Sequence, residues 1–248
     1  MKLRYALIIA ILLTGLIACD SYIAHTLNSK AKEKDIVTIS RVIDGDTIVL
    51  EDNRHIRLLN INAPEKNTPL SARSIAFVKQ FENKSVEIDI TGTDKYNRYL
   101  ARIYTPDYLN LNLISLGLAS KFLVDQNELS KFTEAEKNAI TLGLGIWNKS
   151  VYFGCFESKI DQLKEIVYLK NHCQNISMSG WEIKDESRKI YKFRNISLGE
   201  IRIHSLNGKD NSTDLFWNNK GSIWNDDRDS LYLFDDKENI VGYETYGY

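Results

Sequence analysis

Between residues 36 and 150, short apolar and β-branched runs alternate with longer segments in which apolar residues recur at helical spacing. Strands are expected over residues 37–42, 47–50, 56–61, 85–90 and 99–104. Helices are expected from Pro69 onward and over residues 109–118 and 133–142, the last with acidic residues in its first turn. Five strands with interspersed helices suit a small Greek-key barrel, although periodicity alone also allows other α+β arrangements.

The second half of the chain has a different rhythm, in which short β-rich runs alternate with clusters of turn-forming residues. Strands are expected over residues 166–169, 181–183, 190–193, 200–204, 231–234 and 240–243. This rhythm favours an all-β sandwich. A chain of 248 residues is long enough for two domains, so we expect one over residues 36–150 and one over 162–248, with a linker over 151–161.

Residues 1–18 have the pattern of a secretory signal peptide, with a short basic segment before an apolar stretch that is brief for a membrane span. The stretch ends in Leu16-Ile-Ala-Cys19, which resembles the bacterial lipobox. Cleavage before Cys19 and lipidation of Cys19 are therefore expected, with residues 19–35 as a polar tether. The protein would then lie outside the cytoplasm, anchored to the membrane by lipid. A plain secretory signal or an uncleaved anchor is the alternative.

Cys155 and Cys173 remain once Cys19 is set aside. Outside the cytoplasm a disulfide between them could persist. The alternative is two unrelated buried thiols, which we favour slightly because Cys155 lies in the predicted linker.

The charge distribution excludes a broad basic surface of the kind that binds nucleic acid without a defined site. The net charge of the whole chain is −1, and residues 36–150 hold 14 Lys and Arg against 14 Asp and Glu. Binding to nucleic acid would have to rest on local recognition of phosphate and would be weak at high salt.

Candidate chemistry gathers in residues 41–65 and around residue 98. Asp46 follows a glycine turn, and Arg57 and the corner Asn62-Ala-Pro-Glu65 end the next predicted strand. A second arginine arrives at Arg98. Carboxylate and amide oxygens are hard ligands for a divalent metal, and two arginine guanidinium groups can each bind two phosphate oxygens. Together they indicate a site for a phosphodiester and a divalent metal.

These segments also carry a resemblance to a known family. Asp44-Gly-Asp-Thr47, Ile56-Arg-Leu-Leu59 with Ala63-Pro-Glu65, Asp94-Lys-Tyr-Asn-Arg98 and Gly145-Ile-Trp147 resemble the staphylococcal nuclease (thermonuclease) family over roughly residues 36–150. The resemblance implies an OB-fold barrel of five strands with three helices. It also implies calcium-dependent hydrolysis of phosphodiester bonds in DNA and RNA, with little sequence preference and 3′-phosphate products.

The resemblance assigns roles residue by residue. Asp46, Asn62 and the Ala63 carbonyl would be metal ligands for Ca²⁺. Glu65 would orient or deprotonate the attacking water, and Arg57 and Arg98 would bind the phosphate and stabilise the transition state. Lys95 and Tyr96 could contact the substrate through its terminal phosphate or nucleotide.

Two departures from the family pattern bear on these roles. Asn62 stands where the family has an aspartate, which removes one negative charge and predicts weaker calcium binding. The base-stacking tyrosines of the family are not found in Gly117-Leu-Ala-Ser-Lys-Phe-Leu-Val-Asp125, so base preference and substrate affinity are open.

The second half resembles another family, the lamin tail domain, over about residues 162–245. The resemblance rests on Ser179-Gly-Trp-Glu-Ile183, Asp214-Leu-Phe-Trp217, Ile223-Trp-Asn-Asp226 and Ser230-Leu-Tyr-Leu-Phe234. It implies an immunoglobulin-like sandwich and names no partner for this domain.

Two alternatives to the nuclease hypothesis stay open on sequence alone. Asn62, the missing tyrosines and the neutral charge would suit a catalytically weak or inactive OB module that only binds nucleic acid on a surface lipoprotein. A structural lipoprotein organised around its second domain is the other alternative.

Overall fold

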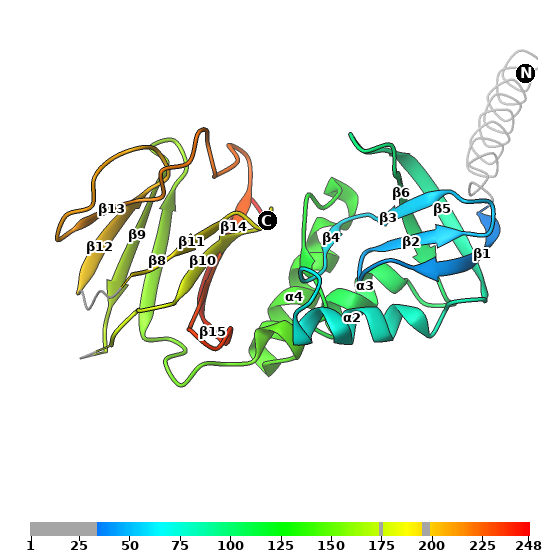
Figure 1. Ribbon diagram of the computed structural model, residues 1–248, viewed down its shortest axis with the longest axis horizontal. Coiled ribbons are helices and arrows are strands. Elements are labelled where there is room, and N and C mark those ends of the chain that lie inside the picture. The colour runs from blue at the N-terminus through cyan, green and yellow to red at the C-terminus, as the bar shows by residue number, and fades with distance from the viewer. Residues whose placement is uncertain (1–33, 174–175, 195–198) are drawn as a thin grey trace, which may run out of the picture. The chain divides into compact units, whose positions relative to one another are not determined.

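The computed structural model of the chain describes residues 34–173, 176–194 and 199–248 (Figure 1). The predicted signal peptide, lipobox and Cys19 lie outside the described residues. Within the described part, no helix has both the length and the apolar character needed to cross a membrane. Residues Ile36–Tyr248 belong to a single unit.

The first part of this unit is a closed five-stranded barrel with three α-helices among its described residues, as expected from the sequence. Its strands run around the barrel in the order β1, β2, β3, β6, β5, and β3 and β6 pair in parallel. The barrel strands are β1 (Asp35–Val42), β2 (Thr47–Leu50), β3 (His55–Leu58), β5 (Ser85–Thr93) and β6 (Tyr99–Tyr104). The helices are α2 (Pro69–Lys79), α3 (Leu109–Ser115) and α4 (Leu129–Leu142), with short 3₁₀ turns η1 (Gln126–Glu128) and η2 (Gly145–Trp147).

The strand predicted over residues 56–61 is broken in the structure. β3 ends at Leu58, and β4 (Ile61–Asn62) leaves the barrel to pair with β7 (Ser120–Lys121). Between them, Asn60 adopts a left-handed conformation with φ of 68°, which asparagine tolerates better than most residues. The Asn60 side chain is held by a hydrogen bond to Glu128, 2.7 Å away. This break turns the Asn62–Glu65 corner away from the barrel ladder and toward the start of α2.

Two predicted helix limits are wrong for identifiable reasons. α3 ends at Ser115 rather than at residue 118, because Gly117 has φ of 64° and packs so closely that an added Cβ would lie 2.2 Å from the Leu144 carbonyl oxygen. α4 begins at Leu129, four residues before the predicted start, and ends at Leu142, followed by Gly143 in the left-handed conformation common after helices. Its first turn therefore holds no acidic residue.

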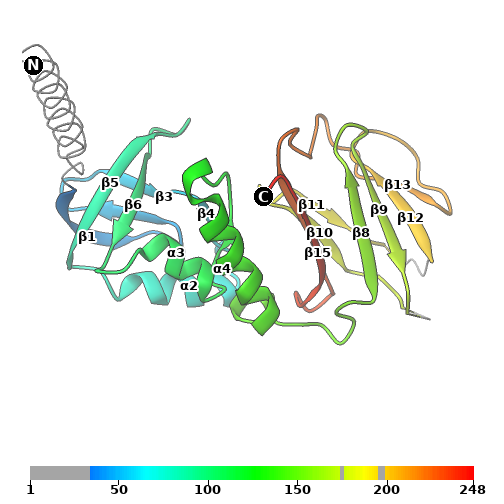
Figure 2. The ribbon, with the colours of Figure 1, turned by 180° about the vertical axis from the view of Figure 1, so that it is seen from behind.

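The remainder of the unit, β8 to β15, forms two four-stranded sheets around a shared apolar core, and we call it the sandwich (Figures 1 and 2). One sheet has the order β11-β10-β14-β15 and the other β13-β12-β9-β8. The strands are β8 (Phe156–Asp161), β9 (Ile166–Asn171), β10 (Glu182–Asp185), β11 (Ile190–Lys192), β12 (Glu200–His204), β13 (Asp214–Phe216), β14 (Asp229–Phe234) and β15 (Ile240–Tyr246).

The segment predicted as a linker contains strand β8, which pairs antiparallel with β9. In this register Phe156 lies opposite Asn171, so the residues just outside the pair come together. Cys155 and Cys173 form a disulfide there, and the slight preference for free thiols is wrong. The preference failed because it treated Cys155 as part of an unstructured connection.

A buried polar cluster joins the barrel to the sandwich. The Lys121 ammonium donates to the Glu136 carboxylate over 2.6 Å and to the Ser230 hydroxyl over 3.0 Å. The Tyr232 hydroxyl lies 3.2 Å from both Glu136 oxygens. Beside this cluster the Trp147 indole packs against Tyr232, with ring centroids 5.0 Å apart. A buried ion pair tolerates little displacement of either partner, so these contacts fix β14 against α4 and β7.

Candidate active site

The turn between β1 and β2 places Asp46 beside the Asn62–Glu65 corner. Gly45 passes so close to α2 that an added Cβ would lie 2.6 Å from the Ser74 Cβ atom and 2.7 Å from that of Ala63. The turn is closed by the Asp44 carboxylate, which accepts a hydrogen bond from the Asp46 backbone over 3.1 Å. Only glycine allows this approach, which explains the Asp44-Gly-Asp order.

The Asp46 carboxylate is buried and held on several sides. One oxygen accepts from the Ala63 backbone N–H over 2.7 Å, and the other accepts from the Thr47 hydroxyl over 3.1 Å. The Arg57 guanidinium lies 3.4 Å away. Burial raises the pKa of Asp46, and the positive charge of Arg57 opposes that rise. A further cation at this carboxylate would stabilise its charged form.

Arg57 is buried behind Asp46, with an exposed fraction of 7%. Its guanidinium donates to the Leu58 carbonyl oxygen over 2.6 Å and to the Asn62 amide oxygen over 3.1 Å. Burial lowers the pKa of Arg57, with the nearby Asp46 charge opposing that change. Because an arginine side chain stays protonated in proteins, the site keeps this positive charge.

Asn62 uses both ends of its amide group. Its oxygen accepts from Arg57, and its nitrogen donates to the Glu186 backbone carbonyl in the sandwich over 3.1 Å. A carboxylate could accept from Arg57 but would meet the Glu186 oxygen with a second oxygen. The asparagine that departs from the family pattern therefore has a structural reason, which lies in the sandwich.

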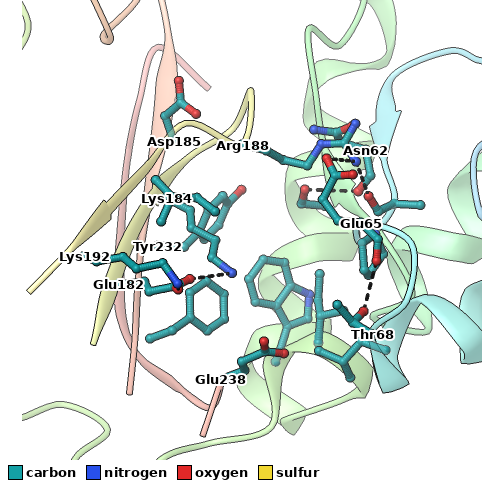
Figure 3. A pocket seen from close by; sticks show the side chains of 18 residues that line it. Asn62, Glu65, Thr68, Glu182, Lys184, Asp185, Arg188, Lys192, Tyr232 and Glu238 are labelled. Atoms are coloured by element: carbon teal, nitrogen blue, oxygen red, sulfur yellow. Dashed lines mark hydrogen bonds and ion pairs between the residues drawn. The ribbon is translucent and has the colours of Figure 1, made fainter. Parts of the chain in front are cut away.

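Glu65 lies at the rim of the site with 69% of its side chain exposed. Its backbone oxygen accepts from the Thr68 hydroxyl at the start of α2 over 3.1 Å. Its carboxylate is met by the Arg188 guanidinium at 3.1 Å, and the same Arg188 nitrogen donates to the Ala63 carbonyl oxygen over 2.8 Å (Figure 3). Arg188 comes from the turn between β10 and β11, more than 120 residues further along the chain.

Arg98 is placed by the Asp94 turn that precedes β6. The Asp94 carboxylate accepts from Arg98 Nε over 2.8 Å, and a second Arg98 nitrogen lies 3.4 Å from the Thr47 hydroxyl. Through Thr47 this arginine reaches the neighbourhood of Asp46.

The structure brings most of the predicted site residues together. Asp46, Ala63, Glu65 and Arg98 line one hollow of about 330 Å³, and Arg57 is buried directly beneath Asp46. The same hollow is lined by Asp44, Pro64, Lys66, Asn67 and Arg188.

Lys95 and Tyr96 do not line this hollow. The Tyr96 ring is 67% exposed, and it lies under two cations, with the Lys95 ammonium 5.1 Å and the Arg98 guanidinium 5.5 Å from the ring centroid. Tyr96 and Arg98 together line a separate neighbouring hollow. A contact between these two residues and a substrate stays a prediction.

No cluster of three or more His, Cys, Asp or Glu side chains poised for a metal exists among the described residues. The oxygen donors of the residues that line the hollow include the Asp44 and Asp46 carboxylates and the Ala63 carbonyl, which also accepts from Arg188. The predicted ligand Asn62 does not line this hollow, and its amide oxygen accepts from Arg57. Carboxylate and carbonyl oxygens are the hard ligands that calcium takes, so these are the residues that could hold the ion.

Of the lining residues that the sequence analysis did not assign to the site, Asp44 and Arg188 bear most on its chemistry. Asp44 belongs to the motif already quoted and could have been found as a second carboxylate two residues from Asp46. Arg188 had no signal in the sequence, because a lone arginine in the second half of the chain matches no motif of the barrel.

Glu186 is a buried carboxylate beside the site, where it accepts from Tyr248 and faces the Leu123 N–H. Burial raises its pKa to about 7, against the Tyr248 hydrogen bond and with added repulsion from Asp229. Because the pKa of this carboxylate is higher in the folded than in the unfolded state, the folded protein loses stability as pH rises from about 4.5 to 7.

We therefore expect Glu186→Gln to be more stable than the natural chain above pH 7, by up to about 3 kcal/mol, with the difference vanishing near pH 4.5. Urea unfolding at several pH values measures this. Glu200→Gln on the exposed start of β12 is the control, because it makes the same change of side chain at a position that is not buried. A stability difference for Glu186→Gln that is constant over this pH range would contradict the assignment.

Comparison with known proteins agrees with this geometry. Residues 55–149 match the family described as Staphylococcal nuclease homologue. The chain is 32% identical over 126 residues to the thermonuclease of Staphylococcus intermedius, which covers 45% of this chain and 75% of that protein. It is 35% identical over 92 residues to an uncharacterized endonuclease of Escherichia coli O157:H7, which covers 36% of this chain. The chain spans 60% of the length of that Escherichia coli relative.

A longer match reaches the SPbeta prophage-derived endonuclease YokF of Bacillus subtilis (strain 168). It is 28% identical over 158 residues, which is 54% of this chain and 53% of that protein. The match to the Staphylococcus intermedius enzyme covers most of that protein, and the barrel places the motif residues in one hollow. The chain belongs to the staphylococcal nuclease family.

Proposed function

We propose that this protein is a calcium-dependent endonuclease that hydrolyses phosphodiester bonds of DNA and RNA with low sequence specificity. The observation that carries the proposal is the convergence of Asp46, Ala63, Glu65 and Arg98 on one hollow above the buried Arg57. A module that only binds nucleic acid has no need for carboxylates beside the phosphate site, because they repel the ligand.

Hydrolysis needs a positioned water, compensation of charge on the phosphoryl oxygens and stabilisation of the leaving oxygen. Asp46 and the Ala63 carbonyl would hold calcium, with Asp44 in place of the predicted ligand Asn62, and the ion would supply positive charge at the phosphate when bound. Glu65 reaches into the hollow from its rim and would orient the attacking water or take its proton.

Arg57 and Arg98 would stabilise the charge on the phosphate and on the leaving oxygen. Arg57 is buried and fixed by hydrogen bonds, so it suits a phosphoryl oxygen that must be held in one place. Arg98 is partly exposed in the hollow and would stabilise charge on the departing 5′-oxygen, leaving 3′-phosphate products. Lys95 and Tyr96 on the adjoining turn would extend contact to the terminal phosphate or nucleotide.

The proposal extends to location and to the second half of the chain. Residues 1–18 would be a lipoprotein signal peptide and residues 19–35 a tether, so that lipid on Cys19 holds the protein at the outer side of the membrane. The Cys155–Cys173 disulfide supports an oxidising compartment. Residues 36–150 would be the nuclease domain, and residues 162–248, beyond the segment 151–161, a lamin tail domain.

Digestion of single-stranded DNA with millimolar calcium, and again with chelator, tests the activity. Cleavage is expected with calcium and is expected to stop with chelator, because the phosphate charge then lacks the divalent cation. Labelling of the product ends distinguishes a 3′-phosphate from a 5′-phosphate. Binding of DNA without cleavage at millimolar calcium would instead establish the binding-module alternative.

A further inference from the structure

One positively charged side chain of the sandwich, that of Arg188, lines the hollow beside the barrel. Arg188 lies in the turn between β10 and β11 and lines the hollow together with Asp46, Glu65 and Arg98. Figure 3 shows its side chain reaching from that turn toward Glu65 and Asn62. None of the roles proposed above uses this residue.

Hydrogen bonds within the turn hold the backbone around Arg188 in place. The Asp185 carboxylate accepts from the Ser187 hydroxyl and from the Lys189 backbone N–H, each over 2.6 Å. Arg188 itself has φ of 71°, and its backbone N–H donates to the Asp185 carbonyl oxygen over 3.1 Å. An arginine in the left-handed region is uncommon, and the surrounding hydrogen bonds hold it there.

The same turn is attached to the barrel at a residue of the site. The Asn62 amide donates to the Glu186 carbonyl oxygen over 3.1 Å, two residues before Arg188. Asn62 in turn is held by Arg57. The position of Arg188 is therefore set by a hydrogen-bonded chain that starts at a buried arginine of the proposed site.

Arg188 is the cation that meets the Glu65 carboxylate. Glu65 is 69% exposed and would sample several rotamers if nothing held it. A single Arg188 nitrogen lies 3.1 Å from the Glu65 carboxylate and 2.8 Å from the Ala63 carbonyl oxygen, which fixes the two groups relative to each other. Hydrogen bonds that involve two charged groups are stronger than neutral ones, so a partly exposed pair can still orient the carboxylate.

We propose that the sandwich completes the nuclease site, with Arg188 as the positioning residue for Glu65. The inference rests on the proposed nuclease function. Catalysis then depends on the docked sandwich, since the barrel alone provides a hollow in which the carboxylate is free to rotate. A displacement of about 1 Å in a catalytic group can cost about 100-fold in rate, which sets the scale of the effect.

The test uses the full chain with saturating calcium and measures kcat and KM for single-stranded DNA. Arg188→Ala is expected to lower kcat by about 10- to 100-fold with little change in KM, because the substrate is bound by other residues. Arg188→Lys keeps the charge and one donor and is expected to recover part of kcat. Arg202→Ala is the matched control, since Arg202 pairs with Asp214 in the other sheet of the sandwich and should leave both constants unchanged.

A double variant separates positioning from a general effect on the fold. If Arg188 acts through Glu65, Arg188→Ala should cause no further loss in a chain that already carries Glu65→Ser. Thermal unfolding of each variant checks that Arg188→Ala remains folded, and Arg188→Lys serves if it does not.

The outcomes separate this inference from the proposed function. A natural chain that does not cleave DNA would remove the proposed function itself. A natural chain that cleaves, with Arg188→Ala equal to it or faster, would overturn the inference, and a faster variant would identify Arg188 as an obstruction. A rise in KM alone, or equal losses in the natural and Glu65→Ser backgrounds, would also overturn it, because either would make Arg188 a substrate contact or a separate contributor.

Discussion

Replacing Glu65 with glutamine is expected to lower kcat for DNA cleavage by about 100- to 10,000-fold, the range typical of a lost general base. Glutamine has the same shape and keeps an oxygen that can accept from Arg188, but it does not take a proton from water. Because the Glu65 side chain is 69% exposed, the substitution removes no buried contact and should leave the thermal midpoint unchanged. Single-turnover cleavage of a short labelled oligonucleotide measures the chemical step directly.

Glu51→Gln is the matched control for this experiment. Glu51 is also exposed and lies in the turn after β2, so its replacement removes the same charge from the barrel surface away from the hollow. Equal losses in the two variants would point to a general charge effect. Full activity of Glu65→Gln would show that this carboxylate neither orients nor deprotonates the attacking water.

Replacing Arg57 with alanine is expected to cause a second large loss, about 1,000-fold or more in kcat/KM. An arginine that stabilises the transition state of phosphoryl transfer contributes effects of about 1,000- to 100,000-fold. The substitution also leaves the buried Asp46 without its nearest arginine, so the free energy of unfolding should fall by roughly 3 kcal/mol. Steady-state kinetics and urea unfolding measure the two effects separately.

Two further variants separate the effect of the positive charge of Arg57 from that of its guanidinium shape. Arg57→Lys keeps the positive charge near Asp46. Its ammonium group lacks the planar fork with which the guanidinium donates to both Leu58 and Asn62. It should therefore recover most of the stability and little of the activity. Arg54→Ala is the control, because Arg54 pairs with Asp52 in the turn between β2 and β3 and should leave both quantities unchanged. Full activity of Arg57→Lys would contradict a role for the guanidinium fork.

The barrel strands were predictable because their signal is local. β2 is buried at every position and β5 alternates along its first half, and such patterns are visible in any short window of sequence. The Asp44–Thr47 turn was visible for the same reason, since a glycine between two aspartates marks a tight turn wherever it occurs. The break at Asn60 was hidden, because the apolar residues on both sides continue the strand pattern and only the pairing of β4 with β7 shows the turn.

The partners of buried polar residues and of the cysteines could not be predicted from local sequence patterns. Glu136 lies in the predicted helix over residues 133–142, and only its pairing with Lys121 and Tyr232 shows that it is buried. Cys155 looked like part of a connection until the register of β8 with β9 brought it to Cys173. In each case the partner lies at least 15 residues away, beyond the window in which a helix or strand pattern is recognised.

The sequence by itself was enough to predict which residues of this protein we propose to act on a phosphodiester. Asp46, Arg57, Glu65 and Arg98 sit on short motifs whose turns and strand ends set their direction locally. Only the tertiary structure decided how those residues are held. Asn62 faces Glu186, and Glu65 faces Arg188, because the turn between β10 and β11, more than 120 residues further along the chain, lies against the barrel. Contacts of that kind depend on long-range packing, which no periodicity along the chain encodes.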